Sequence, residues 1–451
     1  MNSTAIAGRT AVVSCFLILV ACGGGGGGGA ASPPIPSPES GSLDSSFGVS
    51  GMRTTDLGST TDVAYAVVVQ PDGKIVLAGH TTNSITNSDF ALARYDANGN
   101  LDSSFNITGM VETDTGNNRV DGAYGLAMDT TQATDIKVVA VGYALDTTTT
   151  TLDNFALVRY HVSDGSLDTG FGVGGVGKVV TNLPGDGADV ANAVAVQADG
   201  KVVAVGVSNG AGTNDFALIR YNTDGTRDSS FGTNGFVTTV YLGDDIAHAV
   251  AIDANGKIVV AGESGGHVAL VRYHSSAGTG IVPGDLDASF GGGGRVTTPL
   301  GTASRANAIA IQPDGKIVVA GWDEDPINKK NIIVVRYNGD GTLDAGFGFL
   351  GVAATDYNVG NDVANGIALQ GDGKIVVVGH VSDGGTKIVV ARYTTGGALD
   401  TGFGASGMVL PDFGVGSDGY GVAIQSNGKI VAVGSALGTA GNDFALVRIN
   451  P

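Results

Sequence analysis

Three short motifs recur seven times along the chain, always in the same order and about 58 residues apart. They are an Asp-x-x-Phe sequence, a hairpin that closes on a glycine, and an apolar strand that ends in arginine. The aspartates are Asp44, Asp102, Asp168, Asp228, Asp287, Asp344 and Asp400; the closing glycines are Gly79, Gly142, Gly206, Gly262, Gly321, Gly379 and Gly434; the arginines are Arg94, Arg159, Arg220, Arg272, Arg336, Arg392 and Arg448. Seven copies of one unit predict a single repeat array.

The stretch Ala306–Gly321 shows the hairpin most clearly. Alternating apolar residues lead into the turn Pro313-Asp314-Gly315, and a second apolar run leaves it. Proline presets the first turn dihedral, and glycine takes the left-handed conformation that other residues resist. Two β-rich runs around such a turn predict a tight hairpin.

Each unit offers four short strands: one that follows a glycine, two in the hairpin, and one with the pattern FALVRY or a variant. No window keeps a 3.6-residue apolar period over the length of a helix. We therefore predict an all-β fold, a seven-bladed β-propeller of four-stranded blades spanning residues 43–451. An open β-solenoid is the alternative, although its coils are usually shorter than these units and it would need capping ends.

The second strand of each unit is rich in alanine, so we place it at the crowded axis of the ring. The first strand then lies outermost, on the blade before its own. This arrangement predicts that Met52–Thr55 pairs with Phe444–Ile449, so that the N-terminal and C-terminal strands close the seventh blade.

The composition agrees with a turn-rich β protein, because 75 of 451 residues are glycine and only 15% are charged. The chain carries 24 basic and 43 acidic residues, a net charge of −19. Nucleic acid is a disfavoured partner, since phosphate binding needs a cationic face. In the simplest interpretation, the aspartates form turns and keep the protein soluble. The alternative is that they bind cations or cationic ligands.

Residues 1–21 have the pattern of a signal peptide, with Arg9 before a short apolar stretch that ends Leu19-Val20-Ala21-Cys22. This ending resembles the bacterial lipobox, which implies that Cys22 is lipidated and becomes the first mature residue. Residues 22–42, rich in glycine and then proline, are predicted to be a tether. The residue after Cys22 is glycine, and its resemblance to the sorting pattern of enterobacterial lipoproteins implies the outer membrane of a Gram-negative bacterium. We expect a lipid-anchored monomer.

The motifs Leu43-Asp44-Ser45-Ser46-Phe47-Gly48, Pro71-Asp72-Gly73-Lys74 and Phe90-Ala91-Leu92-Ala93-Arg94-Tyr95, with their later copies, resemble the delta-60 repeat family of bacterial β-propeller proteins. The resemblance covers about residues 43–450. It implies the propeller fold, and it implies no particular activity.

Two positions at the start of the second strand are the candidate ligand-binding site. One carries Tyr65, Tyr124, Asn192, His248, Asn307, Asn365 and Tyr420; the other, three residues earlier, carries Asp62, Asp121, Asp189, Asp245, Ser304, Asp362 and Ser417. In a propeller both sets form rings near one mouth of the channel. The alternative is that these polar residues only cap strand starts and bond loop backbone.

The repeated arginine and aspartate predict a bidentate pair that fastens the outer corner of each blade. Segments such as Asp96–Asp102 resemble calcium loops but lack the full ligand spacing, so turns are favoured over calcium and no cofactor is expected. No catalytic triad, zinc motif or phosphate loop stands out.

Two functions remain open from the sequence. The first is a non-enzymatic, lipid-anchored propeller that binds a protein or glycan partner at the cell envelope. The second is a hydrolase or lyase built from aspartate, histidine and tyrosine residues at an acidic channel mouth. The fold alone does not separate them.

Overall fold

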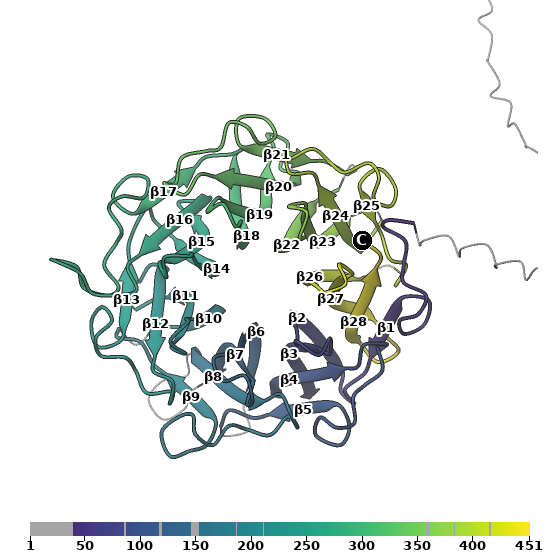
Figure 1. Cartoon of the computed structure of the whole chain (residues 1–451), viewed down its shortest axis with the longest axis horizontal. Coiled ribbons are helices and arrows are strands. Elements are labelled where there is room, and N and C mark those ends of the chain that lie inside the picture. Colours follow the sequence, from purple (N-terminus) through teal and green to yellow (C-terminus); the bar gives the residue numbers. More distant parts are fainter. Residues whose placement is uncertain are drawn as a thin grey trace, which may run out of the picture. The chain divides into compact units, whose positions relative to one another are not determined.

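The computed structural model describes residues 39–451 except 85–86, 117–119, 146–152, 186, 211, 358–359, 383 and 415. The predicted signal peptide, the lipidation site Cys22 and most of the predicted tether lie outside the described residues. The described part consists of seven four-stranded antiparallel sheets arranged around a channel (Figure 1). The predicted seven-bladed propeller is confirmed. Among the described residues there is no helix with the length and hydropathy needed to cross a bilayer.

The strands fall into four sets by their distance from the channel. The innermost are β2 (Thr61–Val69), β6 (Asp121–Asp129), β10 (Asp189–Val196), β14 (Asp245–Ile252), β18 (Ala303–Ile311), β22 (Asp362–Leu369) and β26 (Asp418–Ile424). The second set is β3 (Ile75–Ser84), β7 (Lys137–Leu145), β11 (Val202–Ser208), β15 (Ile258–Ser264), β19 (Ile317–Glu324), β23 (Ile375–Ser382) and β27 (Ile430–Leu437).

The third set is β4 (Asn87–Tyr95), β8 (Asp153–His161), β12 (Asp215–Tyr221), β16 (His267–Tyr273), β20 (Lys330–Tyr337), β24 (Thr386–Tyr393) and β28 (Asn442–Ile449). The outermost set is β5 (Met110–Thr113), β9 (Lys178–Thr181), β13 (Phe236–Thr239), β17 (Arg295–Thr298), β21 (Val352–Thr355), β25 (Met408–Val409) and β1 (Met52–Thr55). We number the blades 1 to 7 by their innermost strands, from β2 to β26.

The order within each sheet agrees with the prediction: the alanine-rich strand is innermost, and the outermost strand comes from the next repeat. Blade 7 joins both ends of the described chain, because β1 pairs antiparallel with β28 and Thr55 lies opposite Phe444. The predicted closure is confirmed.

The closure extends beyond the strands. Asn450 donates its backbone N–H to Ser42 and accepts one from Gly41. The turn after β4 makes the same two bonds within one continuous segment, from Asp96 to Asn100 and from Gly99 to Asp96. Residues 40–42, which we expected in the tether, therefore complete the last turn of the ring.

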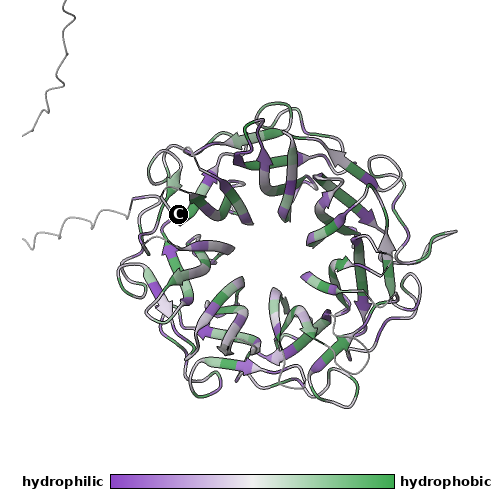
Figure 2. Cartoon of the chain, turned by 180° about the vertical axis from the view of Figure 1, so that it is seen from behind, coloured by the Kyte–Doolittle hydropathy of each residue, from purple (hydrophilic) through white to green (hydrophobic). Residues whose placement is uncertain are grey.

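The apolar core lies between neighbouring blades. Each of its seven clusters joins buried side chains from two adjacent sheets, as where Val138 and Ala140 of blade 2 pack with Val76 and Leu92 of blade 1. Figure 2 shows hydrophobic stretches along the strands of every blade. Burial of these side chains is the dominant stabilising term, at roughly 1.5–3 kcal/mol for each fully buried Val, Leu or Ile.

The three repeated motifs meet at one corner in each blade. The arginine places Nε 2.6–2.9 Å from one carboxylate oxygen of its aspartate, and its guanidinium lies over the phenylalanine of the Asp-x-x-Phe motif at 4.3–4.6 Å. The pairing is confirmed, but the predicted bidentate geometry is wrong. The contacts converge on Oδ2, because Oδ1 accepts hydrogen bonds from the following turn, as Asp228 does from Ser230.

The same corner also links neighbouring blades. The lysine of the hairpin turn contacts the same Oδ2 atom. In blade 3, for example, Lys201 Nζ lies 2.9 Å from Asp228 Oδ2. The guanidinium also donates to the next blade. Arg336 Nη1 of blade 5, for example, donates to the backbone carbonyl of Thr395 in blade 6 at 2.6 Å. Burial raises the pKa of Asp228, but its bonds with Ser230 and Lys201 and the charge of Arg220 outweigh burial and lower the pKa overall.

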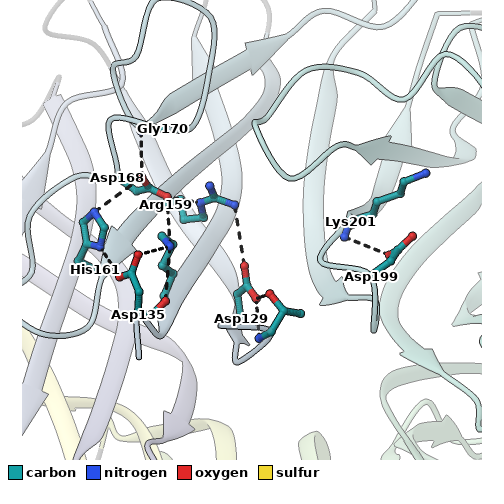
Figure 3. A network of polar contacts seen from close by, with 10 residues as sticks. Asp129, Asp135, Arg159, His161, Asp168, Gly170, Asp199 and Lys201 are labelled. Carbon is teal, nitrogen blue, oxygen red and sulfur yellow. Dashed lines mark hydrogen bonds and ion pairs between the residues drawn. The ribbon is translucent and has the colours of Figure 1, made fainter. Parts of the chain in front are cut away.

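Blade 2 shows how this corner accommodates an insertion. Its longer hairpin loop brings Asp135 to Lys137 at 2.6 Å and to His161 at 2.8 Å (Figure 3). Arg159 contacts Asp168 at 2.7 Å in the usual way and faces Asp129 at 3.9 Å. The extra carboxylates therefore lie outside the corner contact that recurs in every blade, and they do not replace it.

Candidate functional site

Every innermost strand contains a β-bulge, and the bulged residue is the first of the two candidate positions. The pairing register shifts on either side of Tyr65, Tyr124, Asn192, His248, Asn307, Asn365 and Tyr420. A bulge leaves its extra residue outside the ladder and redirects its side chain. The local backbone is therefore the same around all seven side chains, and five of them line the cavity in the channel.

The channel holds a cavity of about 240 Å³, lined by Tyr65, Tyr124, Asn192, His248 and Asn307 among others. The asparagine amides also bond across blades: Asn192 donates to Ala247 O at 2.8 Å and Asn365 donates to Gly419 O at 2.9 Å. The candidate side chains of this position therefore lie together, and some of their polar groups stabilise the ring itself.

Aromatic rings gather on one side of the channel, where blades 7, 1 and 2 meet. The centroid of Tyr65 lies 4.8 Å from Tyr420, 5.0 Å from Tyr124 and 5.6 Å from His80. Tyr124 in turn stacks on Tyr143 with centroids 5.4 Å apart. We call these five residues the aromatic cluster. Their side chains are half-buried, so each ring keeps some surface accessible to a ligand.

Burial governs the ionisation of this cluster. It raises the pKa of Tyr420 to about 12, with a further contribution from Asp418, and it also raises the pKa of Tyr65 and Tyr124. Burial lowers the pKa of His80. The cluster is therefore neutral near pH 7, and it offers aromatic faces and hydroxyl groups.

The opposite side of the mouth is charged. His248 Nε2 lies 3.6 Å from Glu263 Oε1, and Arg305 lies 3.9 Å from the same oxygen. Lys330 places its ammonium 4.0 Å from the centroid of the Trp322 ring. Burial lowers the pKa of His248, and it outweighs the opposing effect of Glu263. The mouth thus has an aromatic side and a side with one acid and two bases.

The second candidate position does not face the channel. Asp62, Asp121, Asp189, Asp245 and Asp362 are at most 1% exposed. Their carboxylates accept backbone N–H groups of the preceding loop, from Leu57, Thr115, Leu183, Tyr241 and Tyr357 at 2.5–2.8 Å. In two blades serine takes the position and bonds the neighbouring strand through its hydroxyl, as Ser304 does with Val268 N. These contacts match the structural alternative, in which the residues bond loop backbone.

Sequence reasoning missed two members of the aromatic cluster, His80 and Tyr143. Each follows the closing glycine of its hairpin and lies opposite a residue of the innermost strand two positions before the bulge. The alternation of the strand offered the only signal, since the residue after a buried glycine must face the other side of the sheet.

The turns that resemble calcium loops use their oxygens internally. Asp96 accepts backbone N–H groups from Asn98 and Asn100, and Asp340 accepts those from Thr342. That no cofactor binds this protein stays a prediction.

Five segments of the chain match the family model described as "Domain of unknown function (DUF5122) beta-propeller": residues 70–105, 197–231, 312–347, 370–403 and 425–451. Each covers a hairpin turn and the segment that follows it, so the match supports a β-propeller repeat family. No curated protein matches the chain.

Several solved structures are similar to this chain over most of its length. YCF48 bound to D1 peptide is 11% identical, with 91% of this chain and 98% of that one covered and a TM-score of 0.45. Sqt1 from Chaetomium thermophilum is 13% identical, with coverages of 87% and 97% and a TM-score of 0.44. The polysaccharide lyase Uly1 is 12% identical, with coverages of 94% and 94% and a TM-score of 0.43. At these identities and TM-scores, the likenesses carry no conclusion about this chain.

Proposed function

We propose that this protein is a non-enzymatic binding protein that holds a glycan at the channel mouth. The aromatic cluster carries the proposal, because apolar C–H faces of a sugar ring pack well on tyrosine rings while hydroxyl and amide groups bond its hydroxyls. Tyr65 lies at the centre of the cluster, in contact with three other rings. Bulges in the innermost strands position Tyr65, Tyr124 and Tyr420, and His80 and Tyr143 lie on the strands paired with them. Strand backbone therefore holds all five rings in place, which limits the entropy lost on binding.

Binding is favoured over the alternative of a hydrolase or lyase by the position of the aspartates. An acid–base mechanism needs carboxyl groups within reach of a substrate. The five candidate aspartates are buried and bond loop amides, so they are committed to the scaffold. Other titratable groups lie near the mouth, but they contact one another: His248 and Arg305 both face Glu263, and His380 lies 3.3 Å from Asp418.

The glycan proposal predicts a large effect of replacing both central rings. In the variant Tyr65→Ala/Tyr124→Ala, affinity for a bound saccharide should fall at least tenfold, which corresponds to about 1.4 kcal/mol. Biolayer interferometry against a panel of immobilised bacterial polysaccharides measures it. Phe349→Ala is the matched control, because Phe349 is an aromatic residue that is 82% exposed and lies outside the cluster. Binding that survives in the double variant, or a panel without any binding saccharide, would contradict the proposal.

We also propose that the propeller is tethered to the bacterial outer membrane through a lipidated Cys22, since the residues before it resemble a lipobox. Cys22→Ser should abolish labelling by an alkyne-tagged palmitate and move the protein from the membrane fraction to the soluble fraction. Cys15→Ser is the control and should leave both unchanged, because that cysteine lies within the predicted signal peptide. Persistent labelling of Cys22→Ser would refute the anchor without affecting the glycan site.

A further inference from the structure

A turn leads into the outermost strand of every blade, directly after the Asp-x-x-Phe motif. We call these seven segments the rim turns; they are residues 48–51, 106–109, 172–177, 232–235, 291–294, 348–351 and 404–407. They contain no charged residue, although 15% of the chain is charged. Turns normally carry polar side chains. The rim turns instead expose large apolar side chains, which are Val49, Ile107, Val173, Val176, Phe349 and Leu350.

Packing within the ring does not explain these apolar side chains. Ile107 is 88% exposed and Val173 is 84% exposed, so they bury little surface. Two of the side chains also stand on left-handed backbone, with φ of +64° at Ile107 and +53° at Leu350. Equivalents of Leu350 in other rim turns are Asn234 and Gly293, which tolerate this conformation, whereas a bulky side chain strains it. Exposed and strained apolar residues indicate contact with another molecule.

The rim turns lie at the end of the ring opposite to the mouth, as blade 5 shows. Val352, the residue after its rim turn, pairs with Val335 near the end of β20. The turn that contains Ile327 precedes β20 and lies at the other end of the blade. The innermost strand begins at that other end, because Ala303 pairs with Glu324. The bulge residues of the mouth follow the starts of the innermost strands, so the mouth and the rim turns lie at opposite ends.

The described chain begins at the same end as the rim turns. Ser40 accepts the backbone N–H of Gly404, a rim-turn residue, at 3.2 Å. Residues 23–38, the predicted tether, connect this point to the proposed anchor at Cys22. A glycine-rich linker of about 16 residues has an r.m.s. end-to-end distance of about 20–24 Å. An anchor on such a linker would hold this end of the ring close to the membrane.

We propose that the rim turns rest on a phospholipid surface, so that the mouth of the channel faces away from the membrane that holds the anchor. This inference rests on the proposed lipidation of Cys22 and not on the proposed glycan site. Apolar side chains of surface-bound proteins enter the boundary between headgroups and acyl chains, to a depth of about 5–10 Å. The exposed apolar side chains of the rim turns fit that environment.

Charge and position define the proposed surface further. Asp224 and Asp340 are exposed, and their backbone carbonyls accept N–H groups of rim turns, so these carboxylates lie beside the rim turns and disfavour an anionic lipid. The proposed partner is therefore a zwitterionic phospholipid. Val173 belongs to blade 2 and Phe349 to blade 5, and these blades lie on opposite sides of the channel (Figure 1). A surface that meets both residues lies across the end of the ring.

The test uses the lipidated full chain in vesicles of phosphatidylcholine whose brominated acyl chains quench tryptophan fluorescence. Trp322 is the only tryptophan in the sequence, so the parent protein supplies the background. Phe349→Trp and Val173→Trp each place a second tryptophan in a rim turn. Its fluorescence should fall by about twofold or more relative to unbrominated vesicles, because the side chain reaches the boundary with the acyl chains.

Ile327→Trp is the matched control, because Ile327 is 80% exposed, as Phe349 is at 82%, and lies at the other end of the same blade. Its fluorescence should be the same in both kinds of vesicle. Equal quenching of Phe349→Trp and Ile327→Trp, or quenching of Phe349→Trp without Val173→Trp, would overturn the inference.

Palmitate labelling of Cys22 is measured on the same samples. A chain without lipid would refute the anchor and this orientation together, whereas a lipidated chain with unquenched rim turns would refute the orientation alone. Neither measurement involves a saccharide, so both results leave the glycan proposal untouched.

Discussion

Deleting residues 39–55 should abolish cooperative folding of the propeller, whereas moving residues 40–55 to follow Pro451 should preserve it. The deletion removes β1, so β28 becomes an exposed edge strand with four residues unpaired. It also removes Phe47, which is fully buried, and Asp44, which lies 2.6 Å from Arg448 and 2.5 Å from Lys429. Loss of one buried phenylalanine alone costs about 3–5 kcal/mol.

The variant with residues 40–55 placed after Pro451 keeps the closing strand but no longer has it at the N-terminal end. It therefore tests whether stability depends on the pairing of this strand or on its place in the sequence. Fusing Ser40 to Pro451 makes the turn after β28 the same length as the turn after β4, and the bonds between Asn450, Gly41 and Ser42 already have the pattern of that turn. Thermal unfolding by circular dichroism and gel filtration provide the measurements. A deletion variant that stays monomeric with an unchanged melting temperature would contradict the closed ring as the source of stability.

Gly206→Ala should destabilise the protein by about 3 kcal/mol or more, an effect at the upper end for added volume in a packed region. A Cβ atom at Gly206 would lie 1.9 Å from the backbone oxygen of Val190 and 3.0 Å from Ala191 Cα. These are backbone atoms of the neighbouring strand just before its bulge, so no side chain can rotate to make room. The strands would have to separate at the point that positions Asn192.

The other six closing glycines face the same contact at 1.8–1.9 Å, so the prediction applies to each blade. Gly371→Ala is the control, since nothing lies within 4 Å of the added atom and its φ is not in the left-handed region. Urea unfolding followed by fluorescence measures both variants. Equal midpoints for Gly206→Ala and Gly371→Ala would show that the strands tolerate the methyl group.

Much of the architecture could be predicted because the same three motifs recur seven times in the sequence. The alternation of apolar residues around turns such as Pro313-Asp314-Gly315 indicated hairpins, and the hairpins form β18 and β19 as expected. The position of Met52–Thr55 before the first hairpin indicated the partner of β28. The pairing of each arginine with the aspartate of the next motif followed from their shared periodicity.

The candidate site was harder to predict, because its chemistry depends on which way side chains point. Asp62 and Tyr65 stand three residues apart, yet Asp62 is fully buried against Leu57 N while Tyr65 contacts a ring of another blade. The bulge between Ala64 and Ala66 makes the two side chains point in different directions, and no residue type in the sequence indicates that a bulge occurs there. His80 joins the cluster through register alone, which depends on the pairing of two strands.

The sequence by itself determined the repeat, the strand order within a blade, the ring and its closure. These follow from local turn chemistry and from apolar burial, which act identically in every copy. Only the tertiary structure decided which polar residues became scaffold and which lie around the channel, and which acids of different blades meet, as Asp89 and Asp121 do. Such contacts join residues of different repeats, so their distances and burial exist only once neighbouring blades have packed together.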